Sequence, residues 1–176
     1  MKFRLSNTED LQRILQVHFN AFGEEEGPTI SRLVTSLLQN QISECNLSIV
    51  AEIEKLIVGH VVFSPVCLST TPNMKAFILS PLATDPKFQR KRVGTELVEY
   101  GINLLRQQHV KVVFVYGDPA YYSGFGFKVE IAANFEPPYT LEYPHGWQAI
   151  ALENDNSLKL LTQVQCVESL SKPGLW

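Results

Sequence analysis

A cluster of positive charges near the middle of the chain stands just before the start of a helical pattern. Four cations fall within six residues: Lys87, Arg90, Lys91 and Arg92. Gly94 follows them. The first N–H groups of a helix have no partner inside the helix, and the helix dipole makes that end positive. A phosphate fits this arrangement, and a glycine lets the backbone approach a bulky anion. The spacing favours a phosphate-binding loop, although a solvated basic loop or a nucleic-acid patch would have a similar composition.

A second candidate for chemistry is the run from Gly117 to Phe127, Gly-Asp-Pro-Ala-Tyr-Tyr-Ser-Gly-Phe-Gly-Phe. Asp118 can cap a short helix whose first residue is Pro119. Glycines at 124 and 126 can end that helix and lead the chain onward. A tyrosine here could donate a proton as a general acid, and it could equally be a core residue, since aromatic side chains dominate cores. The residue types alone leave both functions open.

The segments around these two motifs predict the elements that must position them. Hydrophobic periodicity and capping residues predict helices at 8–22, 29–39 and 94–108, with a Gly-Glu-Pro break at 23–28. Alternating or β-branched runs predict strands at 1–5, 47–53, 56–68, 75–84, 111–116, 126–130 and 148–152. His18 falls on the apolar face of the first helix and is expected to be a hydrogen-bonded core histidine.

The strand at 111–116 is apolar almost throughout, as in a strand buried on both faces. With the strand at 75–84 and the helix between them, it predicts a right-handed crossover between parallel strands. Pro81 cannot donate a ladder bond, which indicates an edge or a bulge at that point. Gly59 marks another bulge or a close approach of the backbone. The order of elements predicts a mixed α/β fold and not a doubly wound sheet.

The bulk composition limits the classes of function. The chain has 176 residues, of which 45% are hydrophobic and 19% charged, with a net charge of −3. This is enough to bury the core of one domain, and the acidic balance argues against nucleic acid as a partner. No apolar run approaches a membrane span or a secretion signal, and three scattered cysteines are typical of a reducing compartment. We therefore expect a cytoplasmic protein that has no membrane partner and no metal site.

The segment Gln89-Arg-Lys-Arg-Val-Gly94 resembles the Q/R-x-x-G-x-G/A signature of the GNAT acyltransferase superfamily. The resemblance extends over roughly residues 1 to 155. It implies that the loop backbone cradles the pyrophosphate of acetyl-CoA and that the preceding strand pairs with the pantetheine arm. The implied cofactor-binding residues are Leu82, Ala83, Thr84, Gln89, Arg90, Arg92, Val93, Gly94 and Thr95.

Arg92 stands where the family has its first glycine. A left-handed backbone would strain an arginine there. Two outcomes remain open: the loop is right-handed at this residue, or the affinity for coenzyme A is lowered. An added cation beside the phosphates would offset part of that cost.

The later motif also resembles the GNAT pattern, and its G-D-P-x-Y-Y-x-x-F-G-F run is close to the YhbS-like branch of the family. The resemblance makes Tyr122 the catalytic general acid, which protonates the thiolate of coenzyme A as it leaves. A backbone N–H near Leu82 would polarise the thioester carbonyl. The general base stays open, because the strand at 75–84 contains no glutamate. The candidates are Glu24, Glu25, Glu26, His60, Asp118, His145 and a water chain.

These features predict an acyltransferase that moves an acetyl group from acetyl-CoA to a small-molecule or peptide amine by direct attack. The implied fold is α/β, with a mixed, mostly antiparallel sheet splayed between two parallel central strands and helices on both faces. Residues 1–176 are expected to form a single N-acetyltransferase domain, with homodimer formation left open. The alternatives are a non-catalytic acyl-CoA sensor and a nucleic-acid-associated module. An aromatic, proline-rich segment at 135–147 is a candidate lining for the acceptor pocket.

Overall fold

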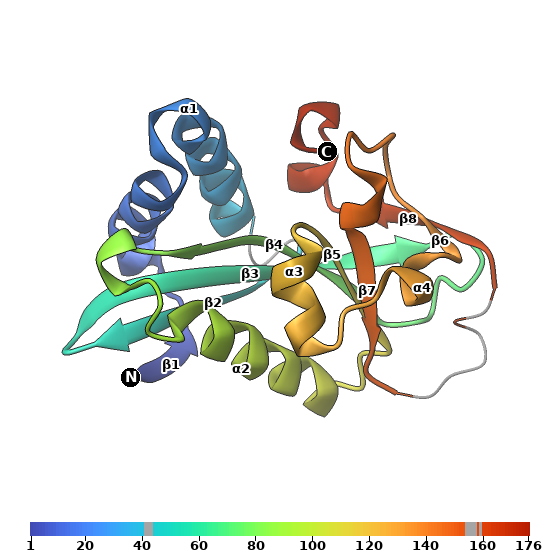
Figure 1. Cartoon of the computed structure of the whole chain (residues 1–176), viewed down its shortest axis with the longest axis horizontal. Coiled ribbons are helices and arrows are strands. Elements are labelled where there is room, and N and C mark those ends of the chain that lie inside the picture. Colours follow the sequence, from blue (N-terminus) through green and yellow to red (C-terminus); the bar gives the residue numbers. More distant parts are fainter. Residues whose placement is uncertain (41–43, 154–157, 159) are drawn as a thin grey trace. The chain divides into compact units, whose positions relative to one another are not determined.

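The computed structural model describes residues 1–40, 44–153, 158 and 160–176 (Figure 1). Its strands are β1 (Lys2–Leu5), β2 (Leu47–Ile53), β3 (Leu56–Leu68), β4 (Ala76–Thr84), β5 (Val112–Tyr116), β6 (Phe135–Glu136), β7 (Trp147–Ala151) and β8 (Thr162–Cys166). Its helices are α1 (Leu11–Gln39), α2 (Val93–Gln107), α3 (Pro119–Tyr122) and α4 (Val129–Ala132), with short 3₁₀ turns between some elements.

The strands form a mixed sheet whose order is β1-β2-β3-β4-β5-β7. β1 with β2, β2 with β3 and β5 with β7 pair antiparallel. β4 and β5 are parallel, and they are joined through α2 as the sequence predicts. β8 pairs antiparallel with β3 and parallel with β6. The predicted α/β class with a mostly antiparallel sheet is therefore confirmed.

The parallel pairing of β4 with β5 runs from Ala76 to Leu79. Within the described chain no ladder pair joins the following residues of β4, from Ser80 to Thr84, to β5. Pro81 falls in this stretch, after a cis peptide bond. The end of β4 is thus an open edge on that side, as its proline indicated.

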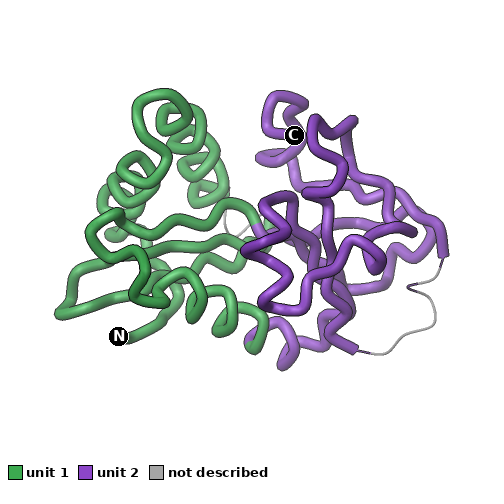
Figure 2. The backbone as a smooth tube through the Cα atoms, viewed as in Figure 1, with its two compact units in different colours: residues 1–63, 80–103 green, residues 64–79, 104–176 purple. Residues whose placement is uncertain are grey.

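The chain divides into two compact units (Figure 2). Unit 1 contains residues 1–63 and 80–103, and unit 2 contains residues 64–79 and 104–176. β3, β4 and α2 each pass from one unit into the other. The expectation of a single domain over residues 1–176 stays a prediction.

In unit 1, α1 and α2 lie on opposite sides of the strands (Figure 1). On the α1 side the buried core consists of Ile14, Val17, Val34, Val50, Ile57 and Ala83. On the α2 side Gly101 packs against the Phe63 ring, since an added Cβ would lie 2.2 Å from a ring carbon. The turn between β2 and β3 consists of Glu54 and Lys55, both with positive φ, which matches the twist of a tight hairpin.

The predicted break at 23–28 was wrong in extent. α1 is interrupted at Gly23 alone, with φ 73° and ψ −168°, and the helix resumes at Glu24. Three glutamates then occupy the first turn, where the helix dipole stabilises acidic side chains. Pro28 is accommodated inside the resumed helix, close to its beginning.

In unit 2, β5 is buried along Val112–Val115 between β4 and β7, as its apolar run predicted. The predicted strand at 126–130 was wrong. Gly126 has φ 91° and ends the preceding turn, and only Lys128 forms a bridge, to Ala149. α4 then begins at Val129, so the chain leaves the sheet after this single bridge.

Candidate active site

The basic loop meets the start of α2, as predicted. The backbone N–H of Glu96 donates to the carbonyl of Arg92 at 2.9 Å, so Arg92 is the cap residue. The N–H groups of Arg92, Val93, Gly94 and Thr95 therefore have no partner inside the helix. These four residues were all predicted from sequence as phosphate-loop residues. The side chains of Lys87, Arg90, Lys91 and Arg92 are exposed beside them.

The end of β4 lies against the same helix start. A Cβ added to Gly59 on β3 would lie 2.7 Å from Val93, 2.9 Å from Leu97 and 3.3 Å from the carbonyl oxygen of Ala83. The absent side chain at Gly59 therefore lets the first turn of α2 approach β3 and β4 closely. Leu82 and Thr84 are half-exposed and alternate with buried Ala83. Unit 1 thus brings the predicted strand residues and loop residues together.

A buried ion pair fixes the beginning of the loop. Asp85 is 4% exposed, and it accepts from Arg13 Nη2 at 2.8 Å and from the N–H of Lys87 at 3.2 Å. Arg13 also donates to the carbonyl of Ile57 at 2.8 Å. Burial by itself would raise the pKa of Asp85, but the hydrogen bond from Arg13 and the other donors hold that pKa below its usual value. Sequence reasoning missed this pair, although Asp-Pro at the start of a turn is a capping signal.

Two loop residues are left-handed: Arg90 has φ 59° and Arg92 has φ 63°. Of the two outcomes left open at Arg92, the right-handed loop is therefore excluded. Left-handed residues in such a loop turn neighbouring N–H groups toward a common centre, which is the geometry of anion-binding nests. Gln89 is also in the loop, and its side-chain amide donates to the carbonyl of Thr84 at 3.4 Å.

Tyr122 belongs to unit 2, at the end of α3. Asp118 caps this helix by accepting from the N–H of Ala120 at 2.8 Å, with Pro119 at the first position. The Tyr122 ring is half-buried and lies 5.0 Å from the Tyr121 ring and 5.8 Å from the Phe127 ring, centre to centre. It also covers Gly117, where an added Cβ would lie 2.5 Å from a ring carbon. Burial raises the pKa of Tyr122, and nearby Tyr121 raises it further, so the phenol is protonated at neutral pH.

The candidate bases are placed very differently. Glu24, Glu25 and Glu26 are exposed in the first turn of the resumed α1. Asp118 and His145 are also exposed, and Asp118 serves as the cap of α3. His60 is fully buried on β3, where it contacts His18 at 2.8 Å. His18 is a core histidine that is hydrogen-bonded through its Nε2, as expected. Its Nδ1 has no partner in the described part of the chain.

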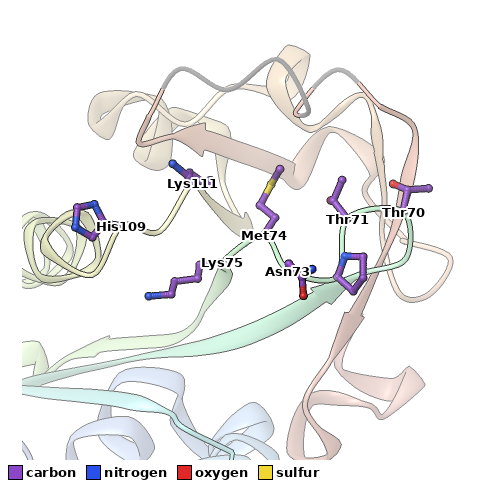
Figure 3. Close-up of a pocket in the computed structure, with 8 residues that line it drawn as sticks. Thr70, Thr71, Asn73, Met74, Lys75, His109 and Lys111 are labelled. Atoms are coloured by element: carbon purple, nitrogen blue, oxygen red, sulfur yellow. The ribbon is translucent and has the colours of Figure 1, made fainter.

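A separate pocket of about 570 Å³ lies within unit 2 (Figure 3). Its basic side chains are Lys75, His109 and Lys111. Lys75 donates to the carbonyl of Gln108 at 3.0 Å, and Lys111 and His109 both face Glu153. None of the predicted site residues lines this pocket. Across the described residues, no group of three His, Cys, Asp or Glu side chains is arranged to hold a metal.

The matching family model is that of the acetyltransferase (GNAT) domain, and it covers residues 2–129. The chain belongs to the GNAT acetyltransferase family. This match includes the end of β4, the basic loop, the start of α2 and Tyr122. The predictions of the family and of an acetyl-CoA-dependent N-acetyltransferase class are thereby confirmed. The roles of individual residues stay predictions.

Two curated relatives from Escherichia coli share about a third of the aligned residues. The uncharacterised N-acetyltransferase YjhQ of strain K-12 is 34% identical over 129 residues, which are 72% of this chain and 68% of YjhQ. The uncharacterised N-acetyltransferase YhbS of the same strain is 35% identical over 83 residues, which are 47% of this chain and 48% of YhbS. The second alignment therefore spans about half of each protein. The resemblance to the YhbS-like branch is supported by this match.

Solved structures share the fold along nearly the whole chain. YhbS of Escherichia coli, solved in complex with CoA, has a TM-score of 0.83 at 23% identity and covers 97% of this chain and 92% of its own. A GNAT acetyltransferase from Brucella melitensis, solved with acetyl-CoA, has a TM-score of 0.75 at 24% identity and covers 96% of each chain. In the described residues, no helix combines the length and the hydropathy that a bilayer crossing requires.

Proposed function

We propose that this GNAT family member transfers an acetyl group from acetyl-CoA to a primary amine on a small molecule or a peptide. Residues 1–176 act as one catalytic domain in this proposal. The amine attacks the thioester carbonyl directly, and coenzyme A leaves as a thiolate. The N-acetyltransferase relatives support an amine as the acceptor, and an uncharged amine is nucleophilic enough to attack a thioester without a covalent enzyme intermediate.

The observation that carries the proposal is the group of four N–H groups at Arg92–Thr95 that have no partner inside α2, next to an exposed cluster of cations. The pyrophosphate of acetyl-CoA would accept from these groups, and the helix dipole adds to the attraction. The main chain of Leu82 and Thr84 would bind the pantetheine amides along the open edge of β4, whereas the carbonyl of Ala83 between them faces Gly59 on β3. Coenzyme A in YhbS and acetyl-CoA in the Brucella protein support this choice of ligand.

In the chemical step the N–H near Leu82 would stabilise the developing oxyanion. Tyr122 would donate its proton to the leaving sulfur, and water would then reprotonate the phenol. The phenol of Tyr122 carries the proton that this role requires throughout the neutral range, since burial raises its pKa.

The first experiment is thermal unfolding with and without acetyl-CoA. A ligand that binds only the folded state adds about 2.7 kcal/mol at a concentration 100-fold above its Kd. We expect a clear rise in Tm at millimolar acetyl-CoA. No rise would contradict both the enzyme and the acyl-CoA sensor.

A charge-matched pair of variants tests the binding site. Lys91→Ala should lower acetyl-CoA affinity several-fold and weaken its dependence on salt, because one cation beside the phosphates is lost. Lys128→Ala removes the same charge from an exposed position in unit 2 and should leave the affinity unchanged. Equal effects of the two variants would rule out the basic loop as the binding site.

Release of free thiol during incubation with a panel of amines separates an enzyme from a sensor. Amine-dependent thiol release at substoichiometric protein supports transfer. The sensor is favoured by one specific feature, the left-handed Arg92, which replaces the family glycine. Binding of acetyl-CoA without thiol release with any amine would establish the sensor instead.

A further inference from the structure

The basic loop, which spans residues 86–92, has a backbone conformation that its own residues do not favour. Arg90 and Arg92 are both left-handed, with φ of 59° and 63°. This conformation crowds the Cβ of any residue other than glycine. Strained residues of this kind persist only where the surrounding structure holds them in place. Contacts at the ends of the loop must therefore maintain its shape.

Asp85 stands between the end of β4 and the basic loop, and it is hydrogen-bonded on both sides. Its N–H donates to the carbonyl of Val58 on the neighbouring strand β3 at 2.9 Å. Its carboxylate accepts from the N–H of Lys87 at 3.2 Å, and its carbonyl accepts from the N–H of Phe88 at 2.7 Å. The direction in which the loop leaves β4 is thus set by three hydrogen bonds of one residue.

Arg13 on α1 joins this residue to a second element of unit 1. Its Nη2 donates to the carboxylate of Asp85 at 2.8 Å, and its Nε donates to the carbonyl of Ile57 on β3 at 2.8 Å. Asp85 is almost entirely buried, and a buried ion pair is screened much less by salt than an exposed one. One guanidinium therefore connects α1 to β3 and to the start of the loop.

We propose that Arg13 and Asp85 are positioning residues for acetyl-CoA, because through their ion pair α1 holds the basic loop in the shape that binds the pyrophosphate. This inference rests on the proposed function. Asp85 does not bind the ligand itself, since its carboxylate is buried and would repel a phosphate. The pair acts instead on the N–H groups of Arg92–Thr95, through the backbone of the loop.

A loop that has its binding shape in the free protein binds more tightly than a loop that must first be ordered. The measured Kd equals the intrinsic Kd divided by the fraction of free molecules whose loop has that shape. When acetyl-CoA is saturating, the loop has the binding shape in every molecule. Loss of the pair should therefore raise the Kd and the KM for acetyl-CoA and leave kcat unchanged.

Asp85→Asn removes the charge of the pair, while the amide oxygen can still accept from the N–H of Lys87. We expect the Kd for acetyl-CoA to rise about tenfold, which corresponds to a loop that has its binding shape in about a tenth of the free molecules. The KM for acetyl-CoA should rise with it, and kcat should equal that of the wild type. Isothermal titration and steady-state kinetics measure these quantities.

Asp10→Asn is the matched control in the same unit. Asp10 is also buried, and it accepts from Arg4 at 2.7 Å and from the N–H of Asn7 at 2.8 Å. It therefore makes the same kinds of contact as Asp85, but it joins β1 to the start of α1. Asp10→Asn should lower stability and leave the Kd for acetyl-CoA unchanged.

Arg13→Lys tests the other partner. Lysine keeps the positive charge, but it lacks the planar fork with which Arg13 binds Asp85 and Ile57 together. We expect a smaller rise in the Kd for acetyl-CoA, about threefold, because one of the two contacts is retained. If Asp85→Asn fails to fold, this variant still decides.

The cations of the basic loop also report on its shape. Trypsin cleaves after lysine and arginine, and residues 87–92 contain four exposed cations. Cleavage requires the backbone to open, so its rate follows the population of the open loop. Asp85→Asn should speed cleavage within the loop several-fold relative to cleavage after Lys128, whereas Asp10→Asn should not.

The outcomes separate the two proposals. An active wild type whose Asp85→Asn and Arg13→Lys variants keep the wild-type Kd would overturn the positioning role and leave the proposed function standing. An equal rise in Kd in Asp85→Asn and Asp10→Asn would also overturn it, since general destabilisation would explain both. A fall in kcat at unchanged KM, or unchanged cleavage of the loop in Asp85→Asn, would do the same. A wild type that neither binds acetyl-CoA nor releases thiol would overturn the proposed function, and the positioning role with it.

Discussion

Arg92 is the residue at which this chain departs most clearly from its family pattern. Its φ of 63° is left-handed, a conformation that costs a residue with a side chain about 1–2 kcal/mol and costs glycine little. The chain must leave the short turn at Pro86–Phe88 and enter α2 at Val93, so it reverses within a few residues. The backbone strain at Arg92 therefore occurs at a residue whose side chain adds a positive charge beside the loop.

The backbone cost at Arg92 can be measured by comparing two substitutions. Arg92→Gly and Arg92→Ala both remove the charge and the weak contacts to Glu96 and Glu99, but only glycine adopts the left-handed conformation freely. We expect Arg92→Gly to be about 1 kcal/mol more stable than Arg92→Ala in urea unfolding. Equal stability of the two variants would mean that the left-handed loop is not maintained in solution.

Tyr122 carries the prediction for the chemical step. Tyr122→Phe keeps the ring contacts with Tyr121 and Phe127 and removes only the hydroxyl. We expect kcat to fall about 100-fold, with acetyl-CoA affinity and Tm almost unchanged, as for loss of a general acid. Steady-state kinetics with thiol detection would measure this, and Tyr121→Phe is the matched control. An unchanged kcat in Tyr122→Phe would remove the residue from that role.

At the scale of elements, the position of α2 depends on the missing side chain of Gly59. Gly59→Ala would place a methyl group 2.7 Å from Val93 and 2.9 Å from Leu97, so the first turn of α2 must shift. We expect a loss of about 1–3 kcal/mol in stability and a weaker acetyl-CoA affinity. Isothermal titration with coenzyme A and urea unfolding would measure both effects.

Gly124→Ala is the control for that variant, because nothing lies within 4 Å of an added Cβ there and its φ is not left-handed. It should change neither property. If Gly59→Ala bound coenzyme A as tightly as the wild type, the close approach of α2 to β3 and β4 would not be what presents the loop.

The sequence predicted the elements better than their contacts. The strands at 47–53 and 56–68 have the predicted bounds, because their alternation and the Glu54–Lys55 turn are local signals. The break in α1 was predicted too long, since glycine, glutamate and proline occur both in loops and in the first turns of helices. The Arg13–Asp85 pair spans 72 residues and the His18–His60 pair spans 42. The hydrophobic periodicity of a segment cannot predict such long-range pairs, because they depend on how α1 packs on the sheet.

At the scale of the whole molecule, stability at acid pH is set by two kinds of group. The pKa of His18 and that of His60 are both lowered, mainly by burial. The pKa of Asp10 is lowered by its hydrogen bond from Arg4, and that of Asp85 by Arg13 despite its burial. Each of these four groups has a lower pKa in the folded state than in the unfolded state, so its contribution to stability is complete above the unfolded-state pKa and is lost as the pH falls. The carboxylates and the histidines differ in the pH range over which this loss occurs. The carboxylates matter below about pH 4, whereas the histidines begin to matter below about pH 6.5.

Between these limits the buried histidines should dominate the pH dependence of stability. An unfolded histidine binds a proton below about pH 6.5, while His18 in the folded state binds one only near its pKa of about 3. The free energy of unfolding should therefore be constant above pH 7 and fall by about 1.4 kcal/mol per pH unit for each histidine as the pH drops from 6 to 4.5. Urea unfolding across this range measures the slope. His60→Gln should reduce it, whereas Ser64→Ala, which changes another fully buried but non-ionisable residue of β3, should not. A flat stability between pH 7 and pH 4.5 would mean that the two histidines are not held uncharged in the core.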